Sequence, residues 1–487
     1  MHIYNSLSKQ KEEFTPQDGK TVRFYVCGPT VYDFSHIGHA RVYVVWDVIQ
    51  RYLRYKGYKI TYVRNVTDID DKIINKAKEE GIRPEQVARK YLYEFWRDME
   101  ALNTQPPDVE PRATEFVPQM IEFIKGLIGK GKAYEAGGDV YFDVKSASKY
   151  GRLTKQNLNE MESGSRDQVL SQEELKERKR HPADFALWKG TDKSESGWPS
   201  PWGHGRPGWH LECSTMIKHV LGETIDMHGG GEDLLFPHHE NEIAQTEGLE
   251  NKPLARFWVH NSFVQVNSEK MSKSLGNFTT IRELLKNYSA DELRLFILQT
   301  HYRNPIDFSV DALQAAKTGM QRLIRAVYGD GSSSANGRDA VPPQVMPSKG
   351  KLTHQLLKGD ASLEQEKTQI ENEFVEALDD DFNTAKAVAF LFKLSDLIGT
   401  AKDKANKEFF VQALKDYAAV LGFTLLDTRK LLPKETTSQL MDLILSLRSE
   451  SKQRKDYATS DLIRKRLAEC GVNVMDTADG ATWENSG

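Results

Sequence analysis

The chain has 487 residues, 39% of them hydrophobic and 28% charged, with a formal net charge of −4. This length allows about two or three domains with a sizeable core. The small net charge is no global sign of nucleic-acid binding, so any such surface must be a local basic patch. No apolar run is long enough to span a bilayer, and the first residues lack the basic and apolar regions of a signal peptide. We therefore expect a cytoplasmic protein that does not bind membranes.

The three cysteines, Cys27, Cys213 and Cys470, lie far apart in the sequence. An odd number of widely spaced cysteines argues against a disulfide framework and leaves metal binding or burial as their uses. Scattered cysteines are usually just buried.

The first predicted unit is a strand over 22–26 that ends at Cys27, followed by a Gly-Pro turn and a helix that stops at Gly57. The sequence His-Ile-Gly-His over 36–39 stands at the start of this helix. A glycine there lets a nucleotide approach the backbone, while the two imidazoles and the helix dipole attract phosphate. By itself the motif is more often an ordinary capped turn than a nucleotide site.

Residues 58–66 alternate like a strand and lead into Thr67 and the acidic run 68–71. A strand, a helix and a second strand predict a right-handed crossover, and therefore a parallel sheet. Ligands of such sheets bind beyond the carboxyl ends of the strands, where both Cys27 and Thr67 fall. The acidic run is just as typical of a capped helix start.

The next part of the chain predicts two helices within 84–131 and a hairpin over 133–144 with a Gly-Gly turn. Residues 145–180 are polar and charged, which predicts a solvated insertion. The stretch 198–209 is rich in Trp, Pro and Gly, which predicts a rigid, irregular loop beside a pocket.

A metal site is the next candidate. After a strand-like run over 224–228 and three glycines, Pro237 suits the first turn of a helix on which His238 and Glu242 share one face. Two thiols, an imidazole and a carboxylate make a candidate tetrahedral zinc set: Cys27, Cys213, His238 and Glu242. His239 and Glu240 compete for the same role.

A strand over 257–266 precedes Lys270-Met271-Ser272-Lys273-Ser274, and a helix over 291–299 follows it. Beyond about residue 310 the strand signals largely cease, and 329–350 reads as a Gly/Ser/Pro-rich linker. Helical patterns predict a bundle from five stretches: 310–328, 362–378, 384–398, 406–421 and 435–449.

A basic run lies near the end of the chain. It consists of Arg448, Lys452, Arg454, Lys455, Arg464, Lys465 and Arg466. From composition alone, such a run is typical of a solvated helix face.

His36-Ile37-Gly38-His39 together with Lys270 to Ser274 resembles the paired signature of class I aminoacyl-tRNA synthetases. The motifs YVCGPTVYDFSHIGH, NVTDIDDKI, GWHLEC, HGGGEDLLFPHHENEIAQ and DDDFNTA (379–385) are similar to those of the cysteinyl-tRNA synthetase family. The similarity extends over nearly the whole chain. It implies an α/β fold with a Rossmann-like parallel-sheet catalytic domain over 1–309, including an inserted connective segment at about 110–200. A helical bundle over 310–428 and a small anticodon-binding domain over 429–487 are expected to follow.

The resemblance implies ATP-dependent ligation of L-cysteine to tRNA(Cys) through cysteinyl-adenylate, with release of AMP and pyrophosphate. It implies one zinc ion on the four residues named above, magnesium with the ATP, and a monomer. The ATP-binding residues would be His36, Gly38, His39 and Lys273. The catalytic residues would be His36, His39, Lys270 and Lys273, the two lysines stabilising pyrophosphate. The cysteine pocket would include Thr67, Trp209 and Asp233, with Asp233 facing the substrate ammonium, and Trp483 would stack on an anticodon base.

Two other functions compete with this one. A ligase that joins cysteine to an amino sugar uses a similar zinc pocket and adenylate, but it would leave the helices beyond residue 310 surplus. A non-catalytic zinc protein that binds RNA would not need both signature motifs.

Overall fold

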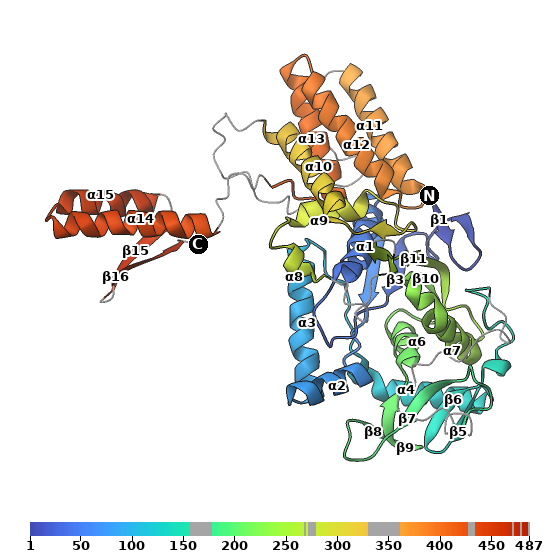
Figure 1. Ribbon diagram of the computed structural model, residues 1–487. Helices are drawn as coiled ribbons and strands as arrows, with labels where there is room; N and C mark the ends of the chain where they lie inside the picture. The colour runs from blue at the N-terminus through green and yellow to red at the C-terminus, as the bar shows by residue number, and fades with distance from the viewer. Residues whose placement is uncertain are drawn as a thin grey trace. The chain divides into compact units, whose positions relative to one another are not determined.

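The computed structural model describes residues 1–155, 178–266, 269–270, 279–329, 361–426, 434–469, 472–477 and 480–485. The chain divides into two compact units, Met1–Leu425 and Leu426–Gly487, which Figure 1 shows as a ribbon. Among the described residues, none of the helices combines the length and the apolar character that a membrane crossing requires.

A parallel sheet forms the centre of the first unit. Its strands are β3 (Thr21–Val26), β4 (Lys59–Arg64), β10 (Ile225–Gly231) and β11 (Ala255–Asn261). They lie in the order β11-β10-β3-β4, and each neighbouring pair is parallel. All the carboxyl ends therefore meet at one edge of the sheet, which is where ligands bind in folds of this type.

Helix α1 (Ile37–Tyr55) connects β3 to β4. The buried side chains Val44, Val48 and Tyr52 recur every four residues and bury one stripe of the helix against the sheet. Trp46 reaches β10 so closely that a Cβ at Gly229 would lie 1.8 Å from its ring. A glycine in β10 is thus needed for α1 to pack on the sheet.

Between β4 and β10 the chain forms helices and a second, antiparallel sheet (Figure 1). The helices are α2 (Asp71–Glu80), α3 (Pro84–Ala101) and α4 (Val117–Gly129). The strands, in the spatial order β5-β6-β7-β9-β8, are β5 (Ala133–Ala136), β6 (Asp139–Phe142), β7 (Phe185–Gly190), β8 (Trp198–Ser200) and β9 (Gly203–Pro207). Most of the predicted solvated insertion, residues 156–177, lies outside the described residues.

The irregular loop predicted over 198–209 is wrong. Strands β8 and β9 pair across a turn at residues 201–202, and helix α6 (Trp209–Val220) begins shortly after β9. The glycines that suggested an irregular loop instead allow close pairing, because a Cβ at Gly205 would lie 2.3 Å from the carbonyl oxygen of Lys189 on β7.

The remaining short elements of the first unit surround the parallel sheet. After β10 the chain turns through Glu232–Leu234 and Leu235–His239 into α7 (Glu240–Glu250). The single strand predicted over 257–266 is in fact two strands, since β11 ends at Asn261 and β12 (Val264–Val266) joins a different sheet. That sheet has β13 (Glu269–Lys270) and β14 (Ile306–Asp307) on either side of β12. The other elements are β1 (His2–Asn5), β2 (Gln10–Glu13), α8 (Ile281–Leu284) and α9 (Ala290–Leu298).

Helices complete the first unit: α10 (Val310–Tyr328), α11 (Ala361–Asp379), α12 (Thr384–Thr400) and α13 (Lys404–Val420). The rings of Phe374, Phe390 and Tyr417 pack between α11, α12 and α13. Their side chains belong to the same hydrophobic cluster as those of the parallel sheet. Apart from Gly329, the predicted linker lies outside the described residues.

The second unit contains α14 (Lys434–Gln453), α15 (Tyr457–Glu469) and the hairpin of β15 (Val472–Thr477) and β16 (Gly480–Asn485). This hairpin corrects the expectation that the chain beyond residue 310 is helical throughout. Val474 is buried while its neighbours Asn473 and Met475 are exposed, so the strand follows the alternation of a half-buried sheet.

Candidate functional site

Cys27 lies directly after β3, at the edge of the sheet where the strands end. The next residue, Gly28, approaches the neighbouring chain so closely that a Cβ there would lie 1.5 Å from the carbonyl oxygen of Asn65. The N–H of Gly28 donates to the side-chain oxygen of Asn65 at 2.8 Å. These contacts fix the backbone that carries the Cys27 thiol.

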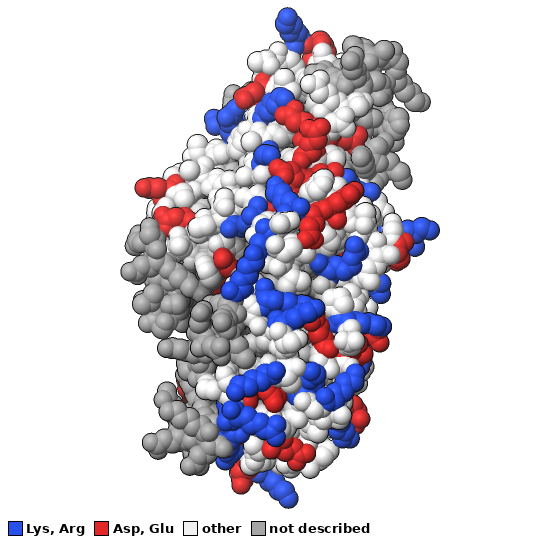
Figure 2. Space-filling view, turned by 90° about the vertical axis from the view of Figure 1, so that its right-hand side faces the viewer, with Lys and Arg blue, Asp and Glu red and all other residues white. Residues whose placement is uncertain are grey.

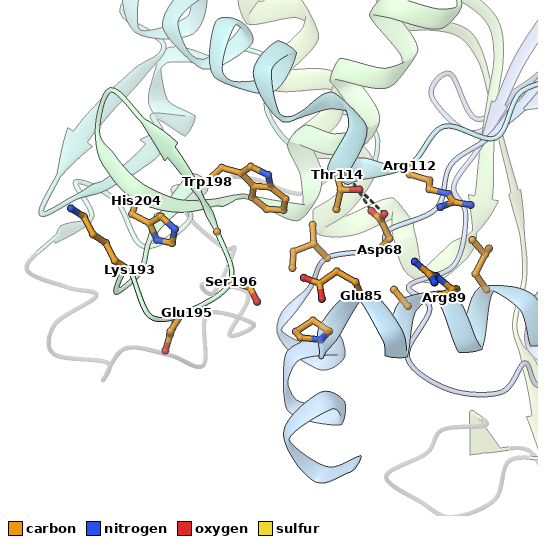
Figure 3. Close-up of a pocket in the computed structure, with 15 residues that line it drawn as sticks. Asp68, Glu85, Arg89, Arg112, Thr114, Lys193, Glu195, Ser196, Trp198 and His204 are labelled. Carbon is orange, nitrogen blue, oxygen red and sulfur yellow. Dashed lines mark hydrogen bonds between the residues drawn. The ribbon is translucent and has the colours of Figure 1, made fainter. Parts of the chain in front are cut away.

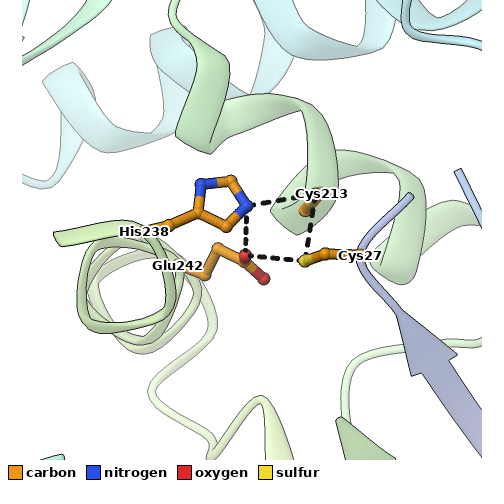
Figure 4. A group of neighbouring side chains, drawn as sticks. All are labelled: Cys27, Cys213, His238 and Glu242. Atoms are coloured by element: carbon orange, nitrogen blue, oxygen red, sulfur yellow. Dashed lines mark hydrogen bonds and ion pairs between the residues drawn. The ribbon is translucent and has the colours of Figure 1, made fainter. Parts of the chain in front are cut away.

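The structure brings the four predicted zinc ligands together, with their donor atoms all within 4.8 Å of one another. Figure 4 shows the side chains of Cys27, of Cys213 on α6, of His238 just before α7 and of Glu242 on α7 converging on one point. The distances are 3.9 Å between the two sulfurs, 3.6 Å from Cys213 to His238 Nε2, 3.7 Å from Cys27 to Glu242 Oε1, and 2.9 Å from His238 Nε2 to Glu242 Oε1.

Three of these four distances are close to those around a tetrahedral ion, and the fourth, 2.9 Å between His238 Nε2 and Glu242 Oε1, is the shorter distance of a direct ion pair. Zinc bonds of about 2.0–2.3 Å place ligand atoms about 3.3–3.8 Å apart. All four side chains are buried, and buried thiol, imidazole and carboxylate groups that meet at one point are the donor types that zinc prefers.

A second set of possible ligands overlaps the first. His228 and His239 join Cys27 and Glu242 in a group whose donor atoms satisfy the same distance limit. His239 Nε2 lies 3.3 Å from the Cys27 sulfur, and His228 Nε2 lies 2.7 Å from Glu242 Oε2. His239 was predicted from the sequence as an alternative metal ligand, but His228 was not. The only sequence signal for His228 was its position at the end of a strand-like run.

Glu240, the other named competitor, belongs to neither metal group. Its carboxylate accepts hydrogen bonds from the backbone N–H groups of Gly151 and Leu153, at 2.8 and 2.9 Å. Glu240 therefore holds the chain around residue 152 in place.

Charge pairing stabilises the metal-free arrangement. Burial raises the pKa of Glu242, but the imidazoles of His228 and His238 outweigh it and lower the pKa to about 2. Burial lowers the pKa of His238, but the neighbouring Glu242 and Cys213 raise it by more, so the net shift of this pKa is upward. Burial and the neighbouring Cys213 thiol raise the pKa of Cys27. A metal ion must therefore displace protons from His238 and Cys27 when it binds, whereas Glu242 is already ionised.

Two of the three residues expected in the cysteine pocket lie beside the metal group. The ring of Trp209 stacks on that of His238 with centroids 4.0 Å apart. The hydroxyl of Thr67 donates to Glu212 Oε2 at 2.7 Å, and Glu212 precedes Cys213 on α6. Trp209 also lines a cavity of about 530 Å³ next to the metal group, together with Thr30, His210 and Phe236.

Asp233 lies on the turn after β10, where its side chain is exposed. The structure gives it no hydrogen bond or ion pair with other described residues, so its pairing with a substrate ammonium stays a prediction. A Cβ at Gly231 would lie 2.4 Å from its carboxylate.

His36 and His39 form the N-terminal cap of α1. His36 Nδ1 accepts a hydrogen bond from the N–H of Gly38 at 3.1 Å, and His39 Nδ1 accepts one from the N–H of His36 at 3.2 Å. The two rings lie 4.0 Å apart. Each imidazole thus turns its Nδ1 atom toward the helix backbone, and these hydrogen bonds fix the orientation of both rings at the start of α1.

The structure also joins the two signature regions. Lys270 ends strand β13, and the chain described again from residue 279 pairs with the residues before α1. The N–H of Ile37 donates to the carbonyl of Thr279 at 3.3 Å, and that of Ile281 donates to the carbonyl of Ser35 at 2.9 Å. Lys273 lies outside the described residues, as does the side chain of Lys270.

A further cavity, of about 570 Å³, lies between the start of α3 and the turn before β8 (Figure 3). Thr114 donates to Asp68 on its wall at 2.7 Å. Acidic and basic side chains both line it: Asp68, Glu85, Glu195, Arg89, Arg112 and Lys193. This mixture of charge does not select an anion or a cation.

The surface, like this cavity, carries a mixture of acidic and basic side chains. On the face shown in Figure 2, basic and acidic side chains are interspersed. In the second unit, Arg448 and Lys452 of the basic run pair with Asp476 at 2.6 and 3.0 Å. Lys455, Arg464 and Lys465 are exposed, and Trp483 is half-buried on β16.

Comparison with known proteins gives matches to two family models. The model "tRNA synthetases class I (C) catalytic domain" matches residues 13–318, and the DALR domain model matches 373–426. Among solved structures, methionyl-tRNA synthetase of Mycobacterium tuberculosis with methionyl-adenylate has a TM-score of 0.53 at 15% identity, covering 88% of this chain and 94% of its own. A ternary LeuRS–tRNA–LeuAMS complex of Agrobacterium radiobacter has a TM-score of 0.58 at 13% identity, covering 84% of each chain. These likenesses confirm the predicted fold class.

Curated relatives match from end to end. The cysteine–tRNA ligase of Geobacter sulfurreducens is 45% identical and is covered over 99% of both chains. Those of Heliobacterium modesticaldum and Clostridioides difficile are 43% and 42% identical, with coverage of 99 to 100%. The chain belongs to the cysteine–tRNA ligase family of class I aminoacyl-tRNA synthetases.

Proposed function

We propose that this chain ligates L-cysteine to tRNA(Cys) in two steps. The cysteine carboxylate attacks the α-phosphate of ATP, which gives cysteinyl-adenylate and pyrophosphate, and a terminal hydroxyl of the tRNA then takes the cysteinyl group and releases AMP. The observation that carries the proposal is the buried group of Cys27, Cys213, His238 and Glu242 beside the carboxyl ends of the sheet. Magnesium accompanies the ATP.

The four side chains would hold one zinc ion. When bound, zinc supplies a soft Lewis acid that takes a substrate thiol as thiolate at neutral pH. A serine hydroxyl is a much poorer ligand for zinc, and alanine offers none. Selection at a site built for one functional group reaches about 10⁴-fold or more, whereas one methylene gives roughly 10 to 200-fold, so no editing step is required.

Neither step needs a side-chain nucleophile, so this chain acts by positioning and by charge stabilisation. His36 and His39 would donate hydrogen bonds to the ATP phosphates at the N-terminus of α1, where the helix dipole attracts the same groups. Lys270 and Lys273 would neutralise the departing pyrophosphate. Trp209 would hold one wall of the cysteine pocket through its stacking on His238.

A substrate thiolate needs an open coordination position, whereas four protein ligands fill a tetrahedral ion. Either the ion would take a fifth ligand, or one protein ligand would give way. Glu242 is the ligand suited to give way, because it contributes the only oxygen donor of the four and His228 already holds its second carboxylate oxygen at 2.7 Å. We place the enzyme in the cytoplasm as a monomer.

The test is cysteine-dependent ATP–pyrophosphate exchange, run beside charging of tRNA(Cys), with zinc measured in the same samples. Wild type and Cys213→Ala are compared, with Cys470→Ala as the control, because the proposed zinc set does not include Cys470. We expect wild type and the control to exchange, charge and hold one zinc, and Cys213→Ala to lose zinc and cysteine activation together. Exchange without charging would favour the small-molecule ligase, and no exchange in wild type would exclude both.

A further inference from the structure

A buried arginine lies two residues beyond His39 on α1. Arg41 is only 1% exposed. Its guanidinium donates to the backbone carbonyl of Phe263 at 2.5 Å, to that of Tyr302 at 3.2 Å, and to that of Asn304. Nothing in the proposed reaction uses this group.

The three carbonyls stand at the starts of two strands. Phe263 immediately precedes β12, and Asn304 comes shortly before β14. Strand β12 pairs with β14 on one side and with β13 on the other, and β13 ends at Lys270. Arg41 therefore holds the small sheet that leads into the second signature motif against the helix that begins with the first.

Tyr302 and Asn304 lie in the loop 299–305, between α9 and β14. The motif at residues 379–385 also contacts this loop. Asp381 is fully buried, and its carboxylate accepts hydrogen bonds from the hydroxyl of Tyr302 at 2.6 Å and from Nε of Arg303 at 2.7 Å. The loop around Tyr302 is thus clamped between α1 and the turn that precedes α12.

We propose that Arg41 is a positioning residue that sets the distance between the first signature motif and strand β13, which ends at Lys270, with Asp381 as its counterpart across the loop. The inference rests on the proposed function, because the motifs must meet the same ATP. A displacement of about 1 Å at reacting groups costs roughly 100-fold in rate. A planar guanidinium with its fork of donors can bind three carbonyls at once, which a lysine ammonium on a flexible stem cannot reproduce.

The experiment compares Arg41→Lys and Arg41→Gln with Arg51→Lys. Arg51 is a matched control on the same helix, since it is also buried and donates to the backbone carbonyls of Asn103 and Ala419. Pyrophosphate exchange is measured per bound zinc, so that misfolded protein is not counted. We expect both Arg41 variants to lose about tenfold or more in kcat, with a raised KM for ATP, while KM for cysteine and zinc content stay within about twofold.

Arg51→Lys is expected to keep its kcat per zinc within about twofold of wild type. An equal loss in Arg51→Lys, or an unchanged kcat in Arg41→Lys, would overturn the inference. If neither Arg41 variant folds, Tyr302→Phe decides, because it removes only the hydroxyl that Asp381 binds. A threefold or greater loss of kcat in that variant supports the clamp, and an unchanged kcat overturns it. Absent exchange in wild type would overturn the proposed function itself, and this inference with it.

Discussion

Asp47 Oδ2 lies 2.7 Å from Arg294 Nη2, and both side chains are almost completely buried, at 1% and 0% exposed. The same carboxylate oxygen accepts from Nε of Arg51 at 2.8 Å. Arg294 also donates to the carbonyl of Leu421, just after α13, at 2.7 Å. One carboxylate thus balances two buried cations where α1, α9 and the end of α13 meet.

Asp47→Asn should lower the free energy of unfolding of the first unit by about 3–5 kcal/mol, because it leaves buried guanidinium groups without their anion. Denaturant unfolding measures this loss. Asp396→Asn is the control, since Asp396 and Arg322 form an ion pair while 67% and 48% exposed. The control should cost no more than about 1 kcal/mol, and an equal loss in both variants would contradict the explanation.

Zinc content should distinguish the two overlapping ligand sets. Cys213 and His238 belong to the first set alone, and His228 and His239 to the second alone. We expect His238→Gln to lose its zinc and His228→Gln to keep it, as measured by metal analysis after dialysis. The reverse pattern would assign the ion to the second set.

Gly229→Ala should prevent α1 from packing on the sheet, since the added methyl would lie 1.8 Å from the ring of Trp46. Overpacking of this kind costs about 1–3 kcal/mol or more. Gly399→Ala in α12 is the control, because nothing lies within 4 Å of its Cβ position. There alanine should stabilise the helix by up to about 1 kcal/mol. Thermal unfolding of the two variants should therefore shift in opposite directions.

Asp416→Asn should change how stability depends on pH. Burial raises the pKa of Asp416 from 3.8 to about 6, against the opposing effects of Gln412 and Lys415. The folded chain then binds a proton more tightly than the unfolded chain, so the wild type loses stability as pH rises from about 4 to about 6.

The asparagine variant should lack this loss. Its melting temperature should exceed that of the wild type by a few degrees at pH 7 and equal it near pH 3.5, as scanned by calorimetry. A constant difference at every pH would show that the carboxyl proton is not the cause.

Much of the fold could be predicted from local sequence patterns. The alternating sequence patterns before Cys27 and before Thr67 predicted two strands. Apolar residues spaced four apart, such as Val44 and Val48, predicted the helix between them. The order of the sheet could not be predicted, because it depends on pairing between strands about 200 residues apart, as for Phe24 on β3 and Met227 on β10. Strands β8 and β9 were missed because their glycines and prolines have low strand propensity, and close packing on β7 overrides it.

More of the candidate site than of the sheet order could be predicted from the sequence. Residue type and spacing made Cys27, Cys213, His238 and Glu242 candidates, with His239 and Glu240 as competitors. The family resemblance favoured these four, and the structure brings them together. His228 could not be chosen, since a histidine within a strand has the same local pattern whether it binds an acid or solvent. The identity of the ion stays a prediction.

The separation of 186 residues between Cys27 and Cys213 has a consequence for biosynthesis. Chains emerge from the ribosome N-terminus first. Cys27 and the strand that carries it are exposed early, yet neither the remaining ligands nor the neighbouring strand β10 exists until much of the chain has been made. A ribosome-bound chain that stops before Glu242 should therefore bind zinc poorly, and metal loading has to wait until β10, the neighbour of β3 in the sheet, has been synthesised.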